Sequence, residues 1–357
     1  MEQKISPIKI ESKPSSSKME LLDILKLLAP GTSLRNALND IRMAKLGALI
    51  VIDKKGLSEM CYGGFNVDCK FTPQRLIELS KMDGGIILSS NMKRILRVNT
   101  LLVPNISVKT NETGTRHQAA ERTAKQMETL VIAISERRHK ITIYYGNLNY
   151  ELEHESSVRR KAMDTLQTLE KQREMFDDSI AHLNILEINN LVTISDVCGV
   201  LQRIEIIQRI YEQMKKYLIE LGNEGVIVSM RLRELIKNLN WEKEMVLKDY
   251  FKDYVRINNL LKTMNFNFLI ETSNLSRTLF GELHDKMVVS KGRRILSKAN
   301  ILEKDIIILM RRYKTLDNIF GADKESLVTI IKNQNVVDVL MPDLKNIEER
   351  IRAGKKV

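Results

Sequence analysis

The first 150 positions carry apolar runs whose lengths predict a mixture of strands and helices. Continuous apolar stretches of strand length occur at residues 47–52, 85–89 and 130–135, which suits strands that are covered on both faces. Such a mixture predicts one α/β domain at residues 18–150, with a mixed sheet flanked by helices. The other elements expected in it are strands at 95–103 and 141–145 and helices at 18–28, 33–45, 72–81 and 115–128.

Turn and capping residues support these boundaries. Thr32 or Ser33 can cap the helix that follows, because a hydroxyl accepts one of the free N–H groups of the first turn. The sequence Tyr62-Gly63-Gly64-Phe65 predicts a tight turn. The last two strands are expected to form a hairpin across the basic residues 136–140.

At Glu151 the pattern changes. Residues 151–280 contain no proline, almost no strand signal, and apolar residues at helical spacing, which predicts an all-α spine. Gly222 and Gly225 break the pattern into hairpins. The apolar stripes are expected to form either the core of the spine or a self-association face. One stripe consists of Val200, Ile204, Ile207, Tyr211, Met214 and Leu218.

The two ends of the chain differ from the spine. Residues 1–17 contain too little apolar material to order themselves, so a flexible tail is expected. Residues 281–357 predict a last module of short helices with basic clusters. Within it, residues 286–298 carry five basic side chains and no acid.

The composition narrows the choice of partner and compartment. The 357 residues include 57 Lys and Arg against 45 Asp and Glu, a formal net charge of +12. This excess attracts nucleotides, nucleic acids or anionic lipids, although a generally lysine-rich composition accounts for it equally well. Cys61, Cys69 and Cys198 lack the spacing of a zinc site or a disulfide framework. Without an apolar run of roughly 20 residues or a secretory signal, a soluble cytoplasmic protein is expected.

A first candidate for chemistry is the sequence Asp83-Gly84-Gly85. Two glycines beside an acid let a ligand approach the backbone, while the carboxylate binds a metal ion or accepts a hydroxyl proton. Taken alone, an Asp-Gly pair is more often a surface turn.

A second candidate, Gly114-Thr115-Arg116-His117, opens a predicted helix. Free N–H groups and the positive end of the helix dipole favour a phosphate there, and Arg116 adds a bidentate donor. A capped helix with a solvated arginine fits the spacing equally well.

A third cluster, Ser135 with Arg137 and Arg138, follows a predicted strand. It supplies further phosphate donors or forms an exposed basic turn. The sequence contains no Walker loop, no Rossmann fingerprint and no nucleophile triad.

The order and spacing of these motifs resemble one enzyme family, the diadenylate cyclases. After the tail, the whole chain resembles those members that join an α/β cyclase domain to a helical spine and a helix-hairpin-helix C-terminal module. The resemblance is carried by Tyr62-Gly63-Gly64-Phe65, Leu79-Ser80-Lys81-Met82-Asp83-Gly84-Gly85, Leu102-Val103-Pro104, Gly114-Thr115-Arg116-His117, Glu121-Arg122 and Ser135 with Arg137-Arg138.

The resemblance implies condensation of two ATP molecules into cyclic di-AMP and two pyrophosphates, with Mg²⁺ or Mn²⁺. Two domains would face each other with one ATP each, within an octamer, so a monomer would be inactive. Asp83 would bind the metal and, with Arg116 and His117, carry catalysis. The ATP contacts it implies are Gly84, Gly85, Leu102, Gly114, Thr115, Arg116, His117, Ser135 and Arg138.

Four positions depart from the family pattern. Gly85 stands where the family has alanine, and Glu136 where it often has arginine. Gln118 and Ala119 stand where it has arginine and threonine, so a guanidinium and a hydroxyl are missing. Loss of one charge-assisted donor costs about 1.5 to 3 kcal/mol, or about ten- to a hundred-fold in binding or rate. The alternative function is therefore a catalytically weakened nucleotide-binding relative with a structural or regulatory role.

The C-terminal module implies a DNA partner, double-stranded or branched, with Lys291, Arg293 and Arg294 as the candidate contacts. Helix-hairpin-helix modules bind phosphates through the N–H groups of a Gly-x-Gly hairpin. Residues 331–335, where the second hairpin is expected, lack those glycines. Weak, salt-sensitive, non-sequence-specific binding is expected, and the alternative is a solvated basic face. A DNA-binding protein without nucleotide chemistry would leave the motifs between residues 62 and 138 unexplained.

Overall fold

The computed structural model describes residues 21–281, 285–299 and 301–355. The chain divides into two compact units, Met1–Val158 with Ile219–Glu224 and Arg159–Leu218 with Gly225–Val357. The tail expected at residues 1–17, and the start of the helix expected at 18–28, lie outside the described residues.

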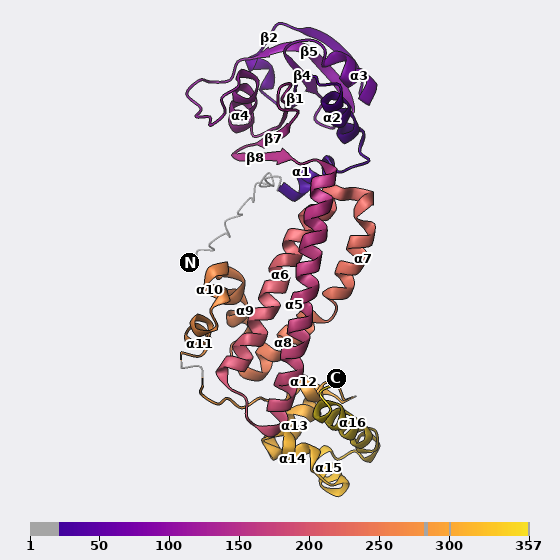
Figure 1. Ribbon diagram of the computed structural model, residues 1–357, viewed down its shortest axis with the longest axis vertical. Coiled ribbons are helices and arrows are strands. Elements are labelled where there is room, and N and C mark those ends of the chain that lie inside the picture. The colour runs from indigo at the N-terminus through magenta and orange to yellow at the C-terminus, as the bar shows by residue number, and fades with distance from the viewer. Residues whose placement is uncertain (1–20, 282–284, 300, 356–357) are drawn as a thin grey trace, which may run out of the picture. The chain divides into compact units, whose positions relative to one another are not determined.

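The first unit contains a mixed eight-stranded sheet (Figure 1). Its strand order is β2-β5-β4-β1-β6-β7-β8, and β3 pairs with β5. β1 pairs with β4 in parallel, whereas the other neighbours are antiparallel. The strands are β1 (Ala48–Ile52), β2 (Cys61–Tyr62), β3 (Phe65–Lys70), β4 (Gly85–Leu88), β5 (Arg94–Leu102), β6 (Leu130–Ile134), β7 (Ile141–Tyr145) and β8 (Leu148–Leu152).

Helices cover both faces of this sheet, which explains the continuous apolar runs. Ile50 and Ile52 of β1 belong to a core shared with three helices, while Leu49 and Val51 pack on the opposite face against the small residues of a fourth. Burial on both faces leaves no position of β1 for a polar side chain. The three helices are α1 (Leu21–Leu27), α2 (Ser33–Met43) and α3 (Pro73–Leu79), and the fourth is α4 (Thr115–Met127).

The predicted strands and helices of this unit are confirmed, with shifts of a few residues at their ends. The hydroxyl of Thr32 accepts the N–H of Arg35, so Thr32 is the N-cap of α2. Sequence patterning missed η1 (Leu57–Met60), β2, β3 and β8. β3 is exposed along most of its length, so it lacks the burial that produces an apolar run.

The spine is helical as expected. α5 (Glu155–Asn189) and α6 (Ile194–Leu221) are its long helices, and in the predicted stripe Val200, Ile204, Ile207 and Met214 are buried. α6 ends where Gly222 takes φ +54, and η2 (Gly222–Gly225) follows. The shorter helices are α7 (Val226–Leu235), α8 (Leu239–Tyr250), α9 (Tyr254–Thr263), α10 (Phe266–Ile270) and α11 (Thr272–Phe280).

The C-terminal helices pack around a core that includes Leu309, Leu327 and Leu340. Lys332 takes the left-handed conformation, with φ +57, at the end of α15, and the side chain of Asn333 caps α16. The connection between these helices is thus made without glycine. The helices are α12 (Arg293–Leu296), α13 (Glu303–Tyr313), α14 (Leu316–Phe320), α15 (Lys324–Ile331) and α16 (Gln334–Arg352).

Over the described ranges, every helix is too short or too polar to cross a membrane. α16 has 19 residues, more than the short helices expected in this module, and it continues through Pro342.

Candidate functional site

A pocket of about 550 Å³ lies at one edge of the sheet. β1 and β4 run parallel and begin there, and their antiparallel neighbours β5 and β6 end there, so four strands bring their terminal residues together. The pocket is lined by Leu49, Gly84, Gly85, Thr100, Leu101, Leu102, Gly114, Thr115, Arg116, His117, Ala119, Ser135, Glu136 and Arg137.

Gly84 and Gly85 provide the close backbone approach at the start of β4. Gly84 has φ +87, and a Cβ there would lie 2.9 Å from the backbone carbonyl carbon of Asn99, so no larger residue fits. A Cβ on Gly85 would lie 3.3 Å from the carbonyl oxygen of Thr100 and 3.6 Å from Leu102. An alanine at position 85 therefore needs only a slight adjustment.

The first turn of α4 forms the opposite wall. Gly114 is the N-cap and provides no side-chain hydrogen bond, so the free N–H groups at this helix start remain available to a ligand. The guanidinium of Arg116 lies directly over Gly47, where a Cβ would be 2.7 Å from Cζ. Gly47 thus makes room for the arginine at the pocket.

His117 is half-buried beside the fully buried Tyr144, with an edge-to-face ring contact of 6.5 Å between centroids. Burial lowers the pKa of His117, the carboxylate of Glu112 opposes that effect, and Arg116 and Arg138 lower it further. The ring is therefore predominantly neutral at pH 7. A neutral imidazole can donate one hydrogen bond to a phosphate and gain a proton when the anion binds.

The polar loop before α4 is fastened to that helix. Arg122 Nε donates to the carbonyl oxygen of Val108 at 3.0 Å, and Lys125 Nζ donates to that of Lys109 at 2.9 Å. The carboxylate of Glu121 accepts from Thr110, Asn111 and Lys125. Burial alone would raise the pKa of Glu121, but these hydrogen bonds outweigh it and lower the pKa.

Glu112 connects the same loop to the sheet. Its carboxylate accepts hydrogen bonds from Tyr144 Oη at 2.9 Å and from Asn149 Nδ2 at 3.1 Å. Gln118 Nε2 donates to the carbonyl oxygen of Glu112 at 2.9 Å. At position 118 the glutamine amide thus holds the loop, whereas the methyl group of Ala119 lines the pocket.

Two predicted site residues, Asp83 and Arg138, do not line the pocket. Asp83 is exposed immediately before Gly84, and Arg138 is exposed with its backbone N–H donated to Ser135 Oγ at 3.2 Å. The remaining predicted ATP contacts all line it. Arg137, adjacent to Arg138, contributes to the wall in its place.

The surroundings of Asp83 indicate what kind of metal site it could form. Over the described ranges, no three His, Cys, Asp or Glu side chains are grouped to hold an ion. Mg²⁺ is usually bound by one or two carboxylates together with substrate phosphates rather than by a cage of protein ligands. An exposed carboxylate beside a pocket lined by Arg116 and the start of a helix fits that kind of site.

Sequence patterning missed three residues of the pocket wall, which are Leu49, Thr100 and Leu101. Thr100 is a fully buried polar residue in β5, directly opposite Gly85 in the sheet register. The sequence alone does not reveal this register, and strand pairing decides which side chains come together at the pocket. Glu136, a departure from the family pattern named above, places an acid in the same wall as Arg116 and Arg137.

The predicted DNA contacts lie in the second unit, and one of them requires correction. Lys291 and Arg293 are partly exposed, but Arg294 is fully buried and its Nη2 lies 2.8 Å from the carboxylate of Glu187. Arg294 therefore does not present its charge at the surface.

Known proteins match almost the entire chain. Residues 35–148 match the family described as DisA bacterial checkpoint controller nucleotide-binding, and residues 152–282 match the DisA bacterial checkpoint controller linker region. Among solved structures, a double mutant of DacA from Staphylococcus aureus is 23% identical with a TM-score of 0.30, covering 36% of this chain and 86% of that one.

Relatives that match most of the chain have a higher sequence identity. The DNA integrity scanning protein DisA of Clostridioides difficile (strain 630) is 40% identical over 337 residues, covering 92% of this chain and 90% of the relative. The DisA protein of Clostridium botulinum (strain Eklund 17B / Type B) is 38% identical over 349 residues, covering 95% and 98% respectively. The chain therefore belongs to the DisA family of diadenylate cyclases.

Proposed function

We propose that this protein is a diadenylate cyclase that condenses two ATP molecules into cyclic di-AMP with release of two pyrophosphates. The observation that carries the proposal is the convergence of Gly84, Arg116 and His117 on one pocket at the sheet edge. A glycine that admits the nucleotide, a helix start with free N–H groups and a guanidinium together suit a triphosphate.

The reaction is a nucleotidyl transfer between two facing domains. The 3′-hydroxyl of each ATP attacks the α-phosphate of the other, a phosphodiester bond forms, the bond between the α- and β-phosphates breaks, and pyrophosphate leaves. Arg116, His117 and the first turn of α4 would hold the phosphates and stabilise the charge that develops on them. One pocket supplies half of the reacting groups, so a single domain is inactive.

Asp83 would hold Mg²⁺ or Mn²⁺ together with the substrate phosphates. When bound, the metal ion neutralises phosphate charge and lowers the pKa of a coordinated hydroxyl. The carboxylate of Asp83 would also accept the proton of the 3′-hydroxyl. Leu102 would pack on adenine, and Gly85, Gly114, Thr115, Ser135 and Arg138 would complete the ligand contacts.

The wider arrangement belongs to the same proposal. We assign residues 18–150 to the cyclase domain, 151–280 to a helical spine and 281–357 to a helix-hairpin-helix-like module that binds DNA. The active form would be a homo-octamer. We place it in the cytoplasm, where free thiols such as Cys61, Cys69 and Cys198 are usual.

A second function is favoured by one observation. The amide of Gln118 is used to hold Glu112, and Ala119 presents only a methyl group to the pocket. Two phosphate donors typical of the family are therefore absent. This supports the alternative of a nucleotide-binding relative with weakened catalysis that acts as a structural or regulatory DNA-binding oligomer.

Incubation of the purified full-length protein with ATP and Mn²⁺ or Mg²⁺, followed by chromatography, distinguishes the two functions. The cyclase predicts cyclic di-AMP and pyrophosphate in a ratio of one to two. Isothermal titration with a non-hydrolysable ATP analogue measures nucleotide binding separately. Clear binding with no cyclic di-AMP would overturn the cyclase and support the weakened relative.

A dilution series tests the facing arrangement. The rate per protein molecule is expected to fall once the concentration drops below that at which the assembly dissociates, because one pocket alone cannot complete the product. A rate per molecule that stays constant while light scattering reports monomers would contradict the two-domain mechanism.

A further inference from the structure

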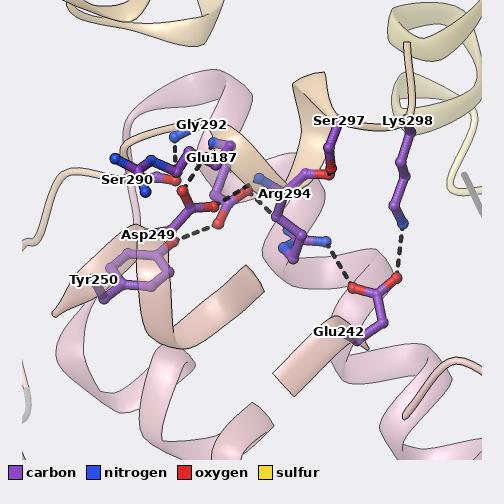
Figure 2. A network of polar contacts seen from close by, with 10 residues as sticks. Glu187, Glu242, Asp249, Tyr250, Ser290, Gly292, Arg294, Ser297 and Lys298 are labelled. Carbon is purple, nitrogen blue, oxygen red and sulfur yellow. Dashed lines mark hydrogen bonds and ion pairs between the residues drawn. The ribbon is translucent and has the colours of Figure 1, made fainter. Parts of the chain in front are cut away.

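A buried polar network fixes the segment Ser290–Arg294 in the second unit (Figure 2). Arg294 is completely buried, and its guanidinium lies between Glu187 of α5 at 2.8 Å and Glu242 of α8 at 3.7 Å. Lys298 also pairs with Glu242, at 2.9 Å. The charge of Arg294 is thus compensated inside the molecule.

The backbone N–H groups of this segment are also occupied. The carboxylate of Asp249 accepts the N–H of Arg293 at 2.8 Å and that of Arg294 at 3.0 Å, and Ser290 Oγ accepts the N–H of Gly292 at 3.0 Å (Figure 2). Asp249 is itself fully buried. An internal carboxylate therefore occupies the position that an external phosphate needs in order to reach these donors, so backbone recognition is blocked at this turn.

Side chains of the same segment face a pocket of about 480 Å³ instead. Lys291 and Arg293 approach it from the turn, and Arg311 and Lys314 approach it from the end of α13. Its other walls are the largely apolar residues Val289, Ile307 and Met310 together with Ser290. Four cationic side chains thus converge on one pocket, and none of its lining residues is acidic.

The positions of these cations are set by the surrounding structure. Lys291 Nζ donates to the carbonyl oxygens of Lys248 and Phe251, each at 3.2 Å, at the end of α8. Gly292 has φ +66, and a Cβ there would lie 2.7 Å from Met310 Sδ, so the turn lies close against α13. The ion pair of Arg293 is weak, since its partner Glu303 is largely exposed and lies 3.7 Å away. Over the described residues, no acid pairs with Arg311 or Lys314.

We propose that this pocket, lined by Lys291, Arg293, Arg311 and Lys314, is the site at which the C-terminal module binds the phosphodiester backbone of duplex DNA. This site rests on the DNA binding proposed above. Its phosphate contacts would come from side chains rather than from the backbone N–H groups of a glycine hairpin. Contacts of this kind position the protein on DNA without reading sequence.

Charge matching favours a nucleic-acid backbone over a single free phosphate. A free phosphate group carries a charge of about −1.5 to −2, which two cations neutralise. A DNA backbone presents successive phosphates with one charge each, and four cations suit several of them at once. Pyrophosphate is a free anion whose phosphate groups resemble those of the DNA backbone. It is therefore tested separately as a competitor.

The test compares two double variants of the full-length protein that each remove two positive charges from the same region. Arg311→Ala with Lys314→Ala removes two cations of the pocket. Lys304→Ala with Arg312→Ala removes two exposed cations of α13 that do not line it. Binding of a fluorescent duplex of about 30 base pairs is measured by anisotropy between about 50 and 200 mM salt, and circular dichroism verifies that both variants fold.

We expect the pocket variant to bind DNA at least ten-fold more weakly at about 0.1 M salt, and its salt slope to decrease by about two, because two phosphate contacts are lost. The control variant should stay within about three-fold of the unchanged protein. Pyrophosphate at millimolar concentration should compete weakly.

The contrary outcomes are distinct. If both variants bind DNA equally weakly, the binding depends on the overall charge of the region and not on the pocket. The pocket would then be ruled out as the site, although the protein would still bind DNA. Unaltered DNA binding by the pocket variant would also rule out the pocket as the site. If the unchanged protein binds no duplex, both the DNA linkage and this site fail. Tight pyrophosphate binding that the pocket variant loses, without DNA binding, would reassign the site to a free anion. None of these results bears on the cyclase reaction, which is measured separately.

Discussion

Two pockets of this protein are lined by cationic side chains, and they are built in different ways. At the sheet edge, the start of α4 leaves backbone N–H groups free and Gly47 makes room for Arg116. In the C-terminal helices, Asp249 occupies the N–H groups, and the side chains alone remain as donors. We therefore expect a glycine that precedes an arginine to indicate a phosphate site only where no internal acceptor occupies the backbone donors.

Two arginines show the same contrast. Arg116 follows Gly114 by two positions, and Arg294 follows Gly292 by two positions. Arg116 lines a pocket, whereas Arg294 is buried between two carboxylates. One should contribute mainly to ligand binding and the other mainly to folding. The predictions below test that separation.

The largest effect is expected for Arg294→Met. It would leave the Glu187 carboxylate buried without its cation, which costs about 3 to 5 kcal/mol of unfolding free energy. Urea unfolding followed through Trp241, the single tryptophan and a residue of α8, reports on this region. Arg293→Met is the matched control and should cost less than about 1 kcal/mol. Similar losses in both variants would remove the contrast between surface and core arginines.

Asp83→Asn is expected to reduce cyclic di-AMP formation by about a hundred-fold or more, because the metal ligand and proton acceptor are lost. Thermal melting should stay unchanged, since Asp83 is exposed. Asp40→Asn, an exposed acid of α2, is the control and should retain full activity. Retained activity in Asp83→Asn would mean that the metal is held elsewhere.

Gly47→Ala tests whether the position of Arg116 matters. The added methyl group would occupy the place of the guanidinium, and the flexible arginine would move away from the pocket. Loss of one charge-assisted donor predicts ATP binding about ten- to a hundred-fold weaker, measured by titration calorimetry. Gly199→Ala is the control, because nothing lies within 4 Å of its added methyl group. An unchanged affinity would show that Arg116 contributes little to binding.

Ala119→Thr adds the hydroxyl that the resemblance to the diadenylate cyclases implies at this position. One additional neutral hydrogen bond predicts ATP binding about two- to ten-fold tighter. Ala44→Thr, at the exposed end of α2, is the control. If Ala119→Thr binds ATP no better, the departure at this position is not what distinguishes the two proposed functions.

The smallest effect concerns His117 and pH. Burial lowers its pKa in the folded protein, so its contribution to stability is complete above about pH 6.5, the ordinary value for histidine, and is lost as the pH falls through the lowered folded pKa. Melting temperatures between about pH 5 and 8 should therefore decline toward acid less steeply in His117→Gln. Parallel curves for the two proteins would mean that His117 is solvated in the folded state.

Elements buried on both faces were predictable, and exposed ones were not. The apolar run of β1 reflects helices packed on both sides of it, so its sequence alone indicated a central strand. β3 pairs with β5 but faces solvent on most of its residues, so nothing in its composition separated it from a loop. Burial produced the signal, and pairing alone did not.

The candidate site followed a similar rule. Gly84, Arg116 and His117 stand in motifs with recognisable spacing, and the structure places all three at one pocket. Arg294 stands in an equally basic motif, but its partner Glu187 lies 107 positions earlier in the chain. No local pattern marks so distant an ion pair, so the sequence placed a core residue on the surface.

The buried ion pairs around Arg294 also have a consequence for divergence among homologues. Residues that satisfy one another in the interior change together or not at all, so Glu187, Glu242 and Arg294 should co-vary as a set. At the proposed DNA site, Arg311 and Lys314 would contact phosphates through their charge, so we expect arginine and lysine to replace one another there. The basic residues of a single short region would then differ in how they are substituted, with the buried arginine constrained by its partners and the exposed cations interchangeable.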